Sequence, residues 1–185
     1  MIQKYFPGEY AASVFDLDYH KLYQRGYRGV ILDIDNTLVP HGADSTPEVD
    51  ALFDEIHSAG LKTILLSDND TERIERFLKN IDSLYIPDAN KPQIDGYLRA
   101  VELLGLEKEQ VVYIGDQIFT DIIGANNAGI DSILVRYIGC GSTKKIGVKR
   151  RIEIVVLKLY AMSKSAQHRF GDVFKEGKSS VLEQG

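Results

Sequence analysis

Hydrophobic positions between residues 29 and 136 form short apolar runs, and longer amphipathic segments separate them. The runs are rich in Val, Ile and Leu, which is typical of strands buried on both faces of a parallel sheet. The pattern predicts five strands, which we place at Val30–Ile34, Lys62–Leu66, Leu84–Ile86, Val111–Ile114 and Ser132–Val135.

Helix start and stop signals lie between these runs. Thr46 and Pro47 provide a cap and a first-turn proline, and Gly60 follows as a stop signal. Similar signals predict three further helices: Glu72–Lys79 capped by Thr71, Gln93–Leu104 between Pro92 and Gly105, and Ile118–Ala128 before Gly129.

Strands that alternate with helices of this length predict right-handed βαβ units. The expected fold class is therefore α/β, a three-layer Rossmann-like parallel sheet with helices on both faces. Ligands of such sheets bind beyond the carboxyl ends of the strands. The residues that follow each apolar run are thus the candidates for chemistry.

Two carboxylates, Asp33 and Asp35, come at the carboxyl end of the first predicted strand. Alternate residues of a strand face the same side, so both would share one small volume. At about 4 Å and an effective dielectric near 20, such a pair repels by roughly 4 kcal/mol. Turn chemistry alone also explains an Asp-x-Asp at this position, because Asp and Asn favour turns.

The next two strands are also followed by polar residues. Ser67 and Asn69 follow the second strand, where a hydroxyl and free backbone N–H groups suit a phosphate oxygen. A turn that caps the following helix is the competing interpretation. Lys91 follows the third strand, and its ammonium would offset the charge of carboxylates and substrate. Taken alone, a lysine at such a position is more often a solvated surface residue.

The fourth strand ends in Gly115-Asp116, and Asp121 lies five residues further on. Gly115 permits a close approach of the backbone. Asp121 has three interpretations: it holds a metal, it orients Lys91, or it is a favourable acid in a first helical turn. Several aspartates converging at one sheet edge require a cation. Mg²⁺ is the expected cofactor, since it prefers oxygen ligands and bridges phosphate.

These motifs resemble those of the haloacid dehalogenase (HAD) superfamily of phosphohydrolases, and more closely its YqeG-type phosphatases of subclass IIIA. The resemblance covers roughly residues 5 to 140. It is carried by Asp33-Ile34-Asp35-Asn36-Thr37-Leu38-Val39-Pro40, Ser67, Lys91, Gly115-Asp116-Gln117-Ile118-Phe119-Thr120-Asp121 and the upstream Ser13-Val14-Phe15-Asp16.

The resemblance implies a phosphoaspartyl mechanism with Mg²⁺. Asp33 would be the nucleophile, and Asp35 would protonate the leaving oxygen and then activate water. The implied metal site comprises Asp33, Asp116, the backbone carbonyl of Asp35, and Asp121 as metal support or lysine partner. Implied substrate-binding residues are Ser67, Asn69 and Lys91.

One position departs from the pattern of the relatives, because Asp68 follows Ser67 where a neutral residue is common. An acid at this position would weaken phosphate binding unless Asp68 points away from the phosphate, towards the helix cap. The gaps between the motifs leave no room for a cap domain, so the site should be open. His41 lies just past the catalytic turn, where it either reaches substrate or is a solvated loop residue.

The composition indicates the cellular compartment of the protein and the kinds of partner it can bind. The 185 residues include one cysteine, Cys140, so no internal disulfide forms and a reduced compartment is expected. No stretch approaches the roughly 20 apolar residues of a membrane span, and no secretory signal is visible, so we expect a cytoplasmic protein. Residues 1–143 carry a net charge of −11, which argues against general nucleic-acid binding.

Residues 144–169 are basic, with a net charge of +7. Ile152, Val155, Val156, Leu159 and Tyr160 share one face of a predicted helix there. The segment is either docked on the core or in peripheral contact with the inner membrane surface. We therefore divide the chain into an aromatic-rich segment packed on the core (1–28), a HAD-like catalytic domain (29–143), and a basic C-terminal helix and tail (144–185).

The expected function is Mg²⁺-dependent hydrolysis of a phosphomonoester, either a phosphorylated small molecule or a lipid headgroup. Phosphatidylglycerophosphate is one candidate, because the related organellar enzymes act on it. Soluble sugar and nucleotide phosphates are the alternative substrates. A non-catalytic HAD-like module that binds a partner is a third interpretation, which the presence of both Asp33 and Asp35 disfavours.

Overall fold

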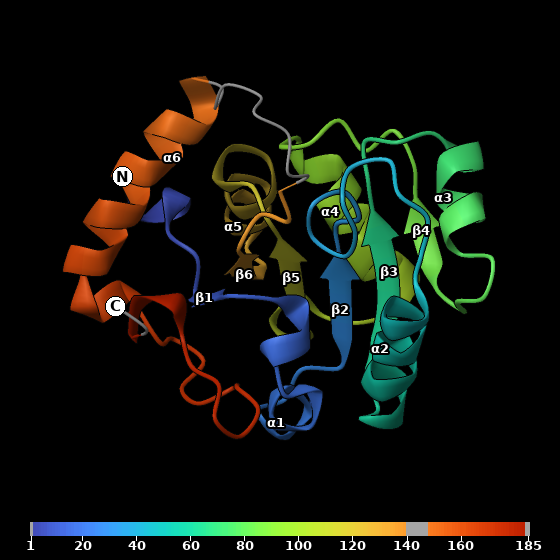
Figure 1. Ribbon diagram of the computed structural model, residues 1–185, viewed down its shortest axis with the longest axis horizontal. Coiled ribbons are helices and arrows are strands. Elements are labelled where there is room, and N and C mark those ends of the chain that lie inside the picture. Colours follow the sequence, from blue (N-terminus) through green and yellow to red (C-terminus); the bar gives the residue numbers. More distant parts are fainter. Residues whose placement is uncertain (1, 140–147, 184–185) are drawn as a thin grey trace.

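A computed structural model describes residues 2–139 and 148–183. Its centre is one sheet of six parallel strands in the order β1-β6-β5-β2-β3-β4 (Figure 1). The predicted α/β class is confirmed. The strands are β1 (Glu9–Ala11), β2 (Gly29–Leu32), β3 (Lys62–Leu66), β4 (Leu84–Ile86), β5 (Val111–Gly115) and β6 (Asp131–Val135).

The sequence pattern missed the edge strand β1. It has only three residues and pairs with β6 through Glu9↔Ile133. Hydropathy gives no strand signal here, because its first residue is a glutamate. That glutamate is nevertheless fully buried, and one of its carboxylate oxygens lies 3.0 Å from Nδ1 of His168 in the C-terminal tail.

The helices follow the predicted start and stop signals with two corrections, of which one is that the helix predicted over Ile118–Ala128 begins as a π-helical turn at Ile118–Ile122. Thr46 accepts a hydrogen bond from the N–H of Val49, and Gly105 ends its helix at a φ of 64°. Thr71 was wrong as a cap: the Asp70 carboxylate accepts from the N–H of Arg73, so the helix begins at Thr71 itself. The helices around the sheet are α1 (Tyr19–Gln24), α2 (Pro47–Ser58), α3 (Thr71–Phe77), α4 (Ile94–Leu104) and α5 (Ile123–Ala128).

Alternate residues of the central strands face two separate cores. Val30 and Leu32 of β2 pack on the side of α1, α2 and α3, whereas Ile31 packs on the side of α4 and α5. This alternation gives the three layers visible in Figure 1. With the sheet held from both sides, the residues after the strands occupy fixed positions.

The two terminal parts of the chain pack against each other. Gly8 O accepts from the N–H of Arg169, and the Ser180 hydroxyl donates to Tyr10 O, so the C-terminal tail lies beside β1. Helix α6 (Val148–Met162) packs at the outside of the molecule (Figure 1). Cys140 and residues 144–147 of the predicted basic segment lie outside the described residues.

Within the described ranges, no helix is both long enough and apolar enough to span a bilayer. The stretch from β2 to β6 is fully described, and it contains no cap domain. Only α2 lies between β2 and β3, and α3 with β4 lies between β3 and Lys91.

Candidate active site

Two neighbouring strands deliver the central carboxylates. β2 and β5 pair in parallel with Leu32 opposite Ile114, and the N–H of Asp33 donates to Ile114 O at 3.0 Å. Asp33 and Asp116 therefore leave the sheet at the same edge, side by side. Both residues are buried: Asp33 is 6% exposed and Asp116 is 2% exposed.

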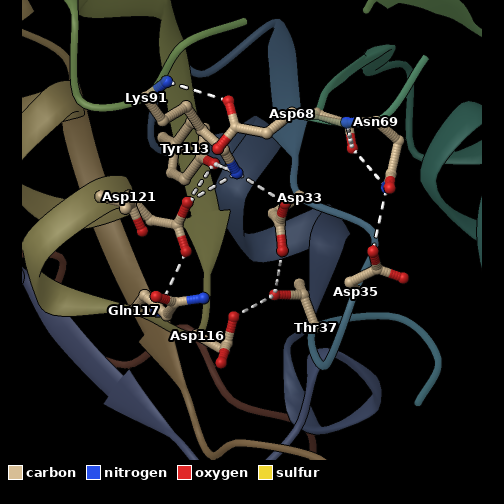
Figure 2. A network of polar contacts seen from close by, with 12 residues as sticks. Asp33, Asp35, Thr37, Asp68, Asn69, Lys91, Tyr113, Asp116, Gln117 and Asp121 are labelled. Carbon is tan, nitrogen blue, oxygen red and sulfur yellow. Dashed lines mark hydrogen bonds and ion pairs between the residues drawn. The ribbon is translucent and has the colours of Figure 1, made fainter. Parts of the chain in front are cut away.

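Three carboxylates gather at this edge (Figure 2). One oxygen from each of Asp33, Asp116 and Asp121 lies within 4.8 Å of the others. The structure thus brings together three of the four aspartates expected around the metal. The fourth, Asp35, turns its carboxylate away from this cluster (Figure 2).

Lys91 inserts its ammonium into the cluster. Nζ donates to Asp33 Oδ1 at 2.6 Å and to Asp121 Oδ1 at 2.8 Å, and the side chain is 5% exposed. Burial alone would lower the pKa of Lys91, but the two carboxylates outweigh it and hold the pKa well above its usual value. Lys91 is therefore a permanent positive charge.

The cluster contains more carboxylates than ammonium groups. Burial raises the pKa of Asp33 to about 6, opposed by the charge of Lys91 and reinforced by that of Asp121. Three carboxylates lie around one ammonium in the cluster. A divalent cation would add positive charge beside them, and the all-oxygen donor set suits Mg²⁺.

Asp121 is held on both oxygens. Oδ1 accepts from the Tyr113 hydroxyl at 2.8 Å as well as from Lys91, and Oδ2 accepts from the N–H of Gln117 at 2.9 Å. It projects from a π-helical turn, η4 (Ile118–Ile122). Its carboxylate lies so close to Gly115 that a Cβ there would come within 2.6 Å of it. The arrangement orients Lys91 whether or not Asp121 also contacts the metal.

Asp35 has its own set of partners on the more open side of the site. Its carboxylate accepts from the N–H of Gly42 and from Nδ2 of Asn69, both at 2.9 Å, and Nη2 of Arg73 lies 3.4 Å away. Burial tends to raise the pKa of Asp35, but these hydrogen bonds, with the charges of His41 and Arg73, hold it below its usual value.

Ser67 and Asn69 form a unit beside Asp35. The Ser67 hydroxyl oxygen accepts from the backbone N–H of Asn69 at 3.2 Å and from its Nδ2 at 2.9 Å. Nδ2 of Asn69 also donates to Asp35 (Figure 2). Asn69 therefore links the Ser67 hydroxyl to that carboxylate. The expected phosphate-binding side chains thus lie next to the expected acid–base residue.

Asp68 does not turn towards the cap of α3. Its carboxylate accepts from the backbone N–H of Lys91 at 2.9 Å, and the cap is made by Asp70 instead. Asp70 already occupies the capping position of α3, and the Asp68 carboxylate accepts from the Lys91 loop instead. Asp68 therefore fixes the loop that presents Lys91.

Sequence reasoning missed three supporting residues. The Thr37 hydroxyl donates to Asp33 Oδ2 at 3.1 Å, Tyr113 binds Asp121, and Arg73 contacts Asp35 and Ala43 O. Thr37 was present in the motif but had no assigned role. Tyr113 lies inside an apolar strand, where the pattern predicts a core residue. A single arginine in an amphipathic helix, such as Arg73, gives no indication that it contacts the site. His41 is mostly exposed, with Nδ1 3.2 Å from the Asp35 carboxylate.

Comparison with known proteins agrees with this geometry. A family model described as haloacid dehalogenase-like hydrolase matches residues 40–129. The chain is 36% identical over 137 residues to "Probable phosphatase YqeG" of Bacillus subtilis (strain 168), spanning 73% of this chain and 80% of that protein. The chain belongs to the haloacid dehalogenase-like hydrolases. As a HAD phosphatase it is a phosphoric monoester hydrolase.

The fold of this HAD phosphatase also occurs in a solved structure. An uncharacterized protein from Listeria monocytogenes serotype 4b superimposes with a TM-score of 0.52 at 21% identity. The match covers 71% of this chain and 98% of the other. At this identity the likeness concerns the fold alone.

Proposed function

We propose that the protein hydrolyses a phosphomonoester in two steps through a phosphoaspartyl intermediate on Asp33, with Mg²⁺ as cofactor. One observation carries the proposal: Asp33 is paired with Lys91 inside a buried carboxylate cluster, while Asp35, two residues on, is held by a separate set of polar partners. One carboxylate is thus placed as nucleophile and the other as acid and base.

The residues present fit a magnesium ion. Asp33 and Asp116 would be its carboxylate ligands, with the backbone carbonyl of Asp35, and Asp121 would support it from behind Lys91. When bound, Mg²⁺ would neutralise the cluster and withdraw charge from a phosphoryl oxygen. Phosphoryl transfer depends mainly on such positioning and charge neutralisation.

In the first step, an oxygen of Asp33 attacks phosphorus and the bond to the leaving oxygen breaks. Lys91, Ser67 and Asn69 hold the phosphoryl oxygens, and Asp35 transfers its proton to the leaving oxygen. The pKa of Asp35 lies below its usual value in the free protein. The negative charge of an arriving phosphate raises it and favours the protonated form that the step requires.

In the second step, water attacks the phosphoaspartate. Asp35, now ionised, accepts a proton from this water as the new bond to phosphorus forms. The bond between phosphorus and Asp33 breaks, which releases inorganic phosphate and restores the carboxylate. The hydrogen bonds from Gly42 and Asn69 keep the Asp35 carboxylate pointed at the same position in both steps.

Phosphatidylglycerophosphate is the substrate that we propose to test first. The site has no cap domain above it, so a bulky phosphate ester can approach, and the family resemblance includes enzymes that act on this lipid. Soluble sugar and nucleotide phosphates remain the alternative, since an open site also admits them. Release of phosphate from a panel of both kinds, at equal concentration, decides between them.

An aryl phosphate with Mg²⁺ tests the reaction itself. We expect Asp33→Asn to abolish turnover, and Asp35→Asn to slow it by at least about 100-fold. Asp82→Asn is the matched control, because Asp82 is exposed and precedes β4 at the opposite end of the sheet. Activity that survives Asp33→Asn would refute the nucleophile. Absence of hydrolysis across the whole panel, together with a stable protein partner, would favour the non-catalytic module.

A further inference from the structure

The outward side of α6 carries an apolar stripe that no other described residue covers. It consists of residues that recur every three or four positions and so share one side of the helix. Exposed apolar residues are ordinary when single, but a continuous row on a folded protein indicates a contact surface. The members and their exposed fractions are Ile152 (48%), Val155 (56%), Leu159 (41%) and Met162 (81%).

The buried side of α6 fixes the orientation of this stripe. Val156 and Tyr160 are buried in a cluster with Phe6 and residues of η4. Glu153, which is 5% exposed, accepts a hydrogen bond from the N–H of Ile118 at 2.9 Å. The sequence pattern placed Ile152, Val155, Val156, Leu159 and Tyr160 on one face, whereas the structure buries Val156 and Tyr160 and exposes the other three. The stripe therefore cannot rotate inward without breaking these contacts.

The same contact ties the stripe to the active site. Ile118 is the first residue of η4, the turn that also presents Asp121 to Lys91. The strands end at the upper side of Figure 1, and the amino-terminal end of α6 lies at that side as well. A surface that binds α6 thus comes close to the edge of the sheet where the carboxylates gather.

Charge indicates what covers the stripe. Arg151 and Lys158 are exposed and lie beside it on the helix, and the only acidic residue of α6, Glu153, is buried. A second copy packed on this stripe would bring two basic rows together, which is unfavourable. An anionic surface satisfies both the apolar row and its basic flank, as interfacial helices do.

We propose that α6 docks the protein on the surface of an anionic lipid bilayer, with Val155, Leu159 and Met162 in the interface and Arg151 and Lys158 against the headgroups. The docking deepens the proposed function, because it brings the open site to phosphate esters held in that surface. It does not depend on catalysis, so the two can fail separately.

Vesicle sedimentation of the full-length protein, without substrate, tests the docking. We compare vesicles of phosphatidylcholine alone with vesicles that also contain phosphatidylserine. We expect binding to the anionic vesicles only, weakening as salt is raised. Arg151→Gln with Lys158→Gln should weaken binding about 25-fold, since each base contributes about fivefold. Val155→Asp with Leu159→Asp should weaken it at least about tenfold.

Leu103→Asp is the matched control, since Leu103 is an exposed apolar residue on another helix, 40% exposed. It should bind like the wild type, and hydrolysis of a soluble aryl phosphate should be unchanged in all of these variants. Equal binding of wild type and the Val155/Leu159 variant, or no binding of the wild type, would overturn the docking. A wild-type dimer that this variant converts to a monomer would overturn it in favour of a second copy.

Discussion

Lys91 and Asp33 form a buried ion pair with 2.6 Å between Nζ and Oδ1, and the same ammonium holds Asp121. Removing one partner of a buried pair leaves the other charge without compensation, which costs about 3–5 kcal/mol. Lys91→Met should therefore lower the free energy of unfolding by about this amount, and turnover by about 100- to 1000-fold.

Urea unfolding without metal measures the first effect. Lys62→Met is the control, because the ammonium of the exposed Lys62 donates to a backbone oxygen, Leu104 O, and its loss should cost less than about 1 kcal/mol. Equal destabilisation by the two substitutions would contradict the assigned charge balance.

Mg²⁺ should stabilise the folded protein through the carboxylate cluster. A ligand that binds the native state alone adds about 2.7 kcal/mol at 100 times its dissociation constant. Asp116→Asn removes one of the three carboxylates of the cluster, so the increase in melting temperature with Mg²⁺ should largely disappear. Thermal scans with and without Mg²⁺ check this. Undiminished stabilisation of the variant would place the ion elsewhere.

The affinity for Mg²⁺ should fall below pH 6. A carboxylate must lose its proton to bind a metal ion, and burial raises the pKa of Asp33 to about 6. Between pH 7 and pH 5 the ionised fraction of such a group falls about tenfold, and the association constant follows it. A carboxylate with its usual pKa would stay ionised over this range. Calorimetric titration at both pH values distinguishes these cases, and a flat profile would contradict the raised pKa.

Gly115 should be essential for activity because of its side-chain neighbour. A Cβ at this position would lie 2.6 Å from the Asp121 carboxyl group, so Gly115→Ala must displace Asp121 and, with it, Lys91. We expect turnover to fall at least about 100-fold. Gly105→Ala is the matched control: its φ of 64° makes alanine costly by about 1 kcal/mol, but its Cβ would meet no neighbour. Steady-state kinetics should show normal turnover for this control.

The sequence predicted the convergence of the site better than its internal contacts. Asp33 and Asp116 follow apolar runs that read clearly as parallel strands, and topology alone brings such strand ends to one edge. Lys91 could be placed at the same edge for the same reason. Its insertion between Asp33 and Asp121 depends on side-chain direction, which hydropathy does not encode.

Other features depended on contacts between distant segments. The strand pattern places Asp35 on the same side as Asp33, but Gly42 and Asn69 draw its carboxylate away once the chain turns after β2. The sequence pattern did not predict β1, because a glutamate is not expected in a buried strand. Glu9 is buried against His168, which comes from the other end of the chain. Likewise, one helical face in α6 became two surfaces only through packing on η4.

The position of the C-terminal tail beside β1 has a consequence for handling the protein. An unprotected edge strand offers its free backbone groups to any other chain, which promotes aggregation. Here Arg169 and Ser180 occupy such groups on Gly8 and Tyr10. A shortened protein that ends before the tail would keep every catalytic group. It would also leave the backbone groups of β1 free to pair with other chains, so we expect it to precipitate.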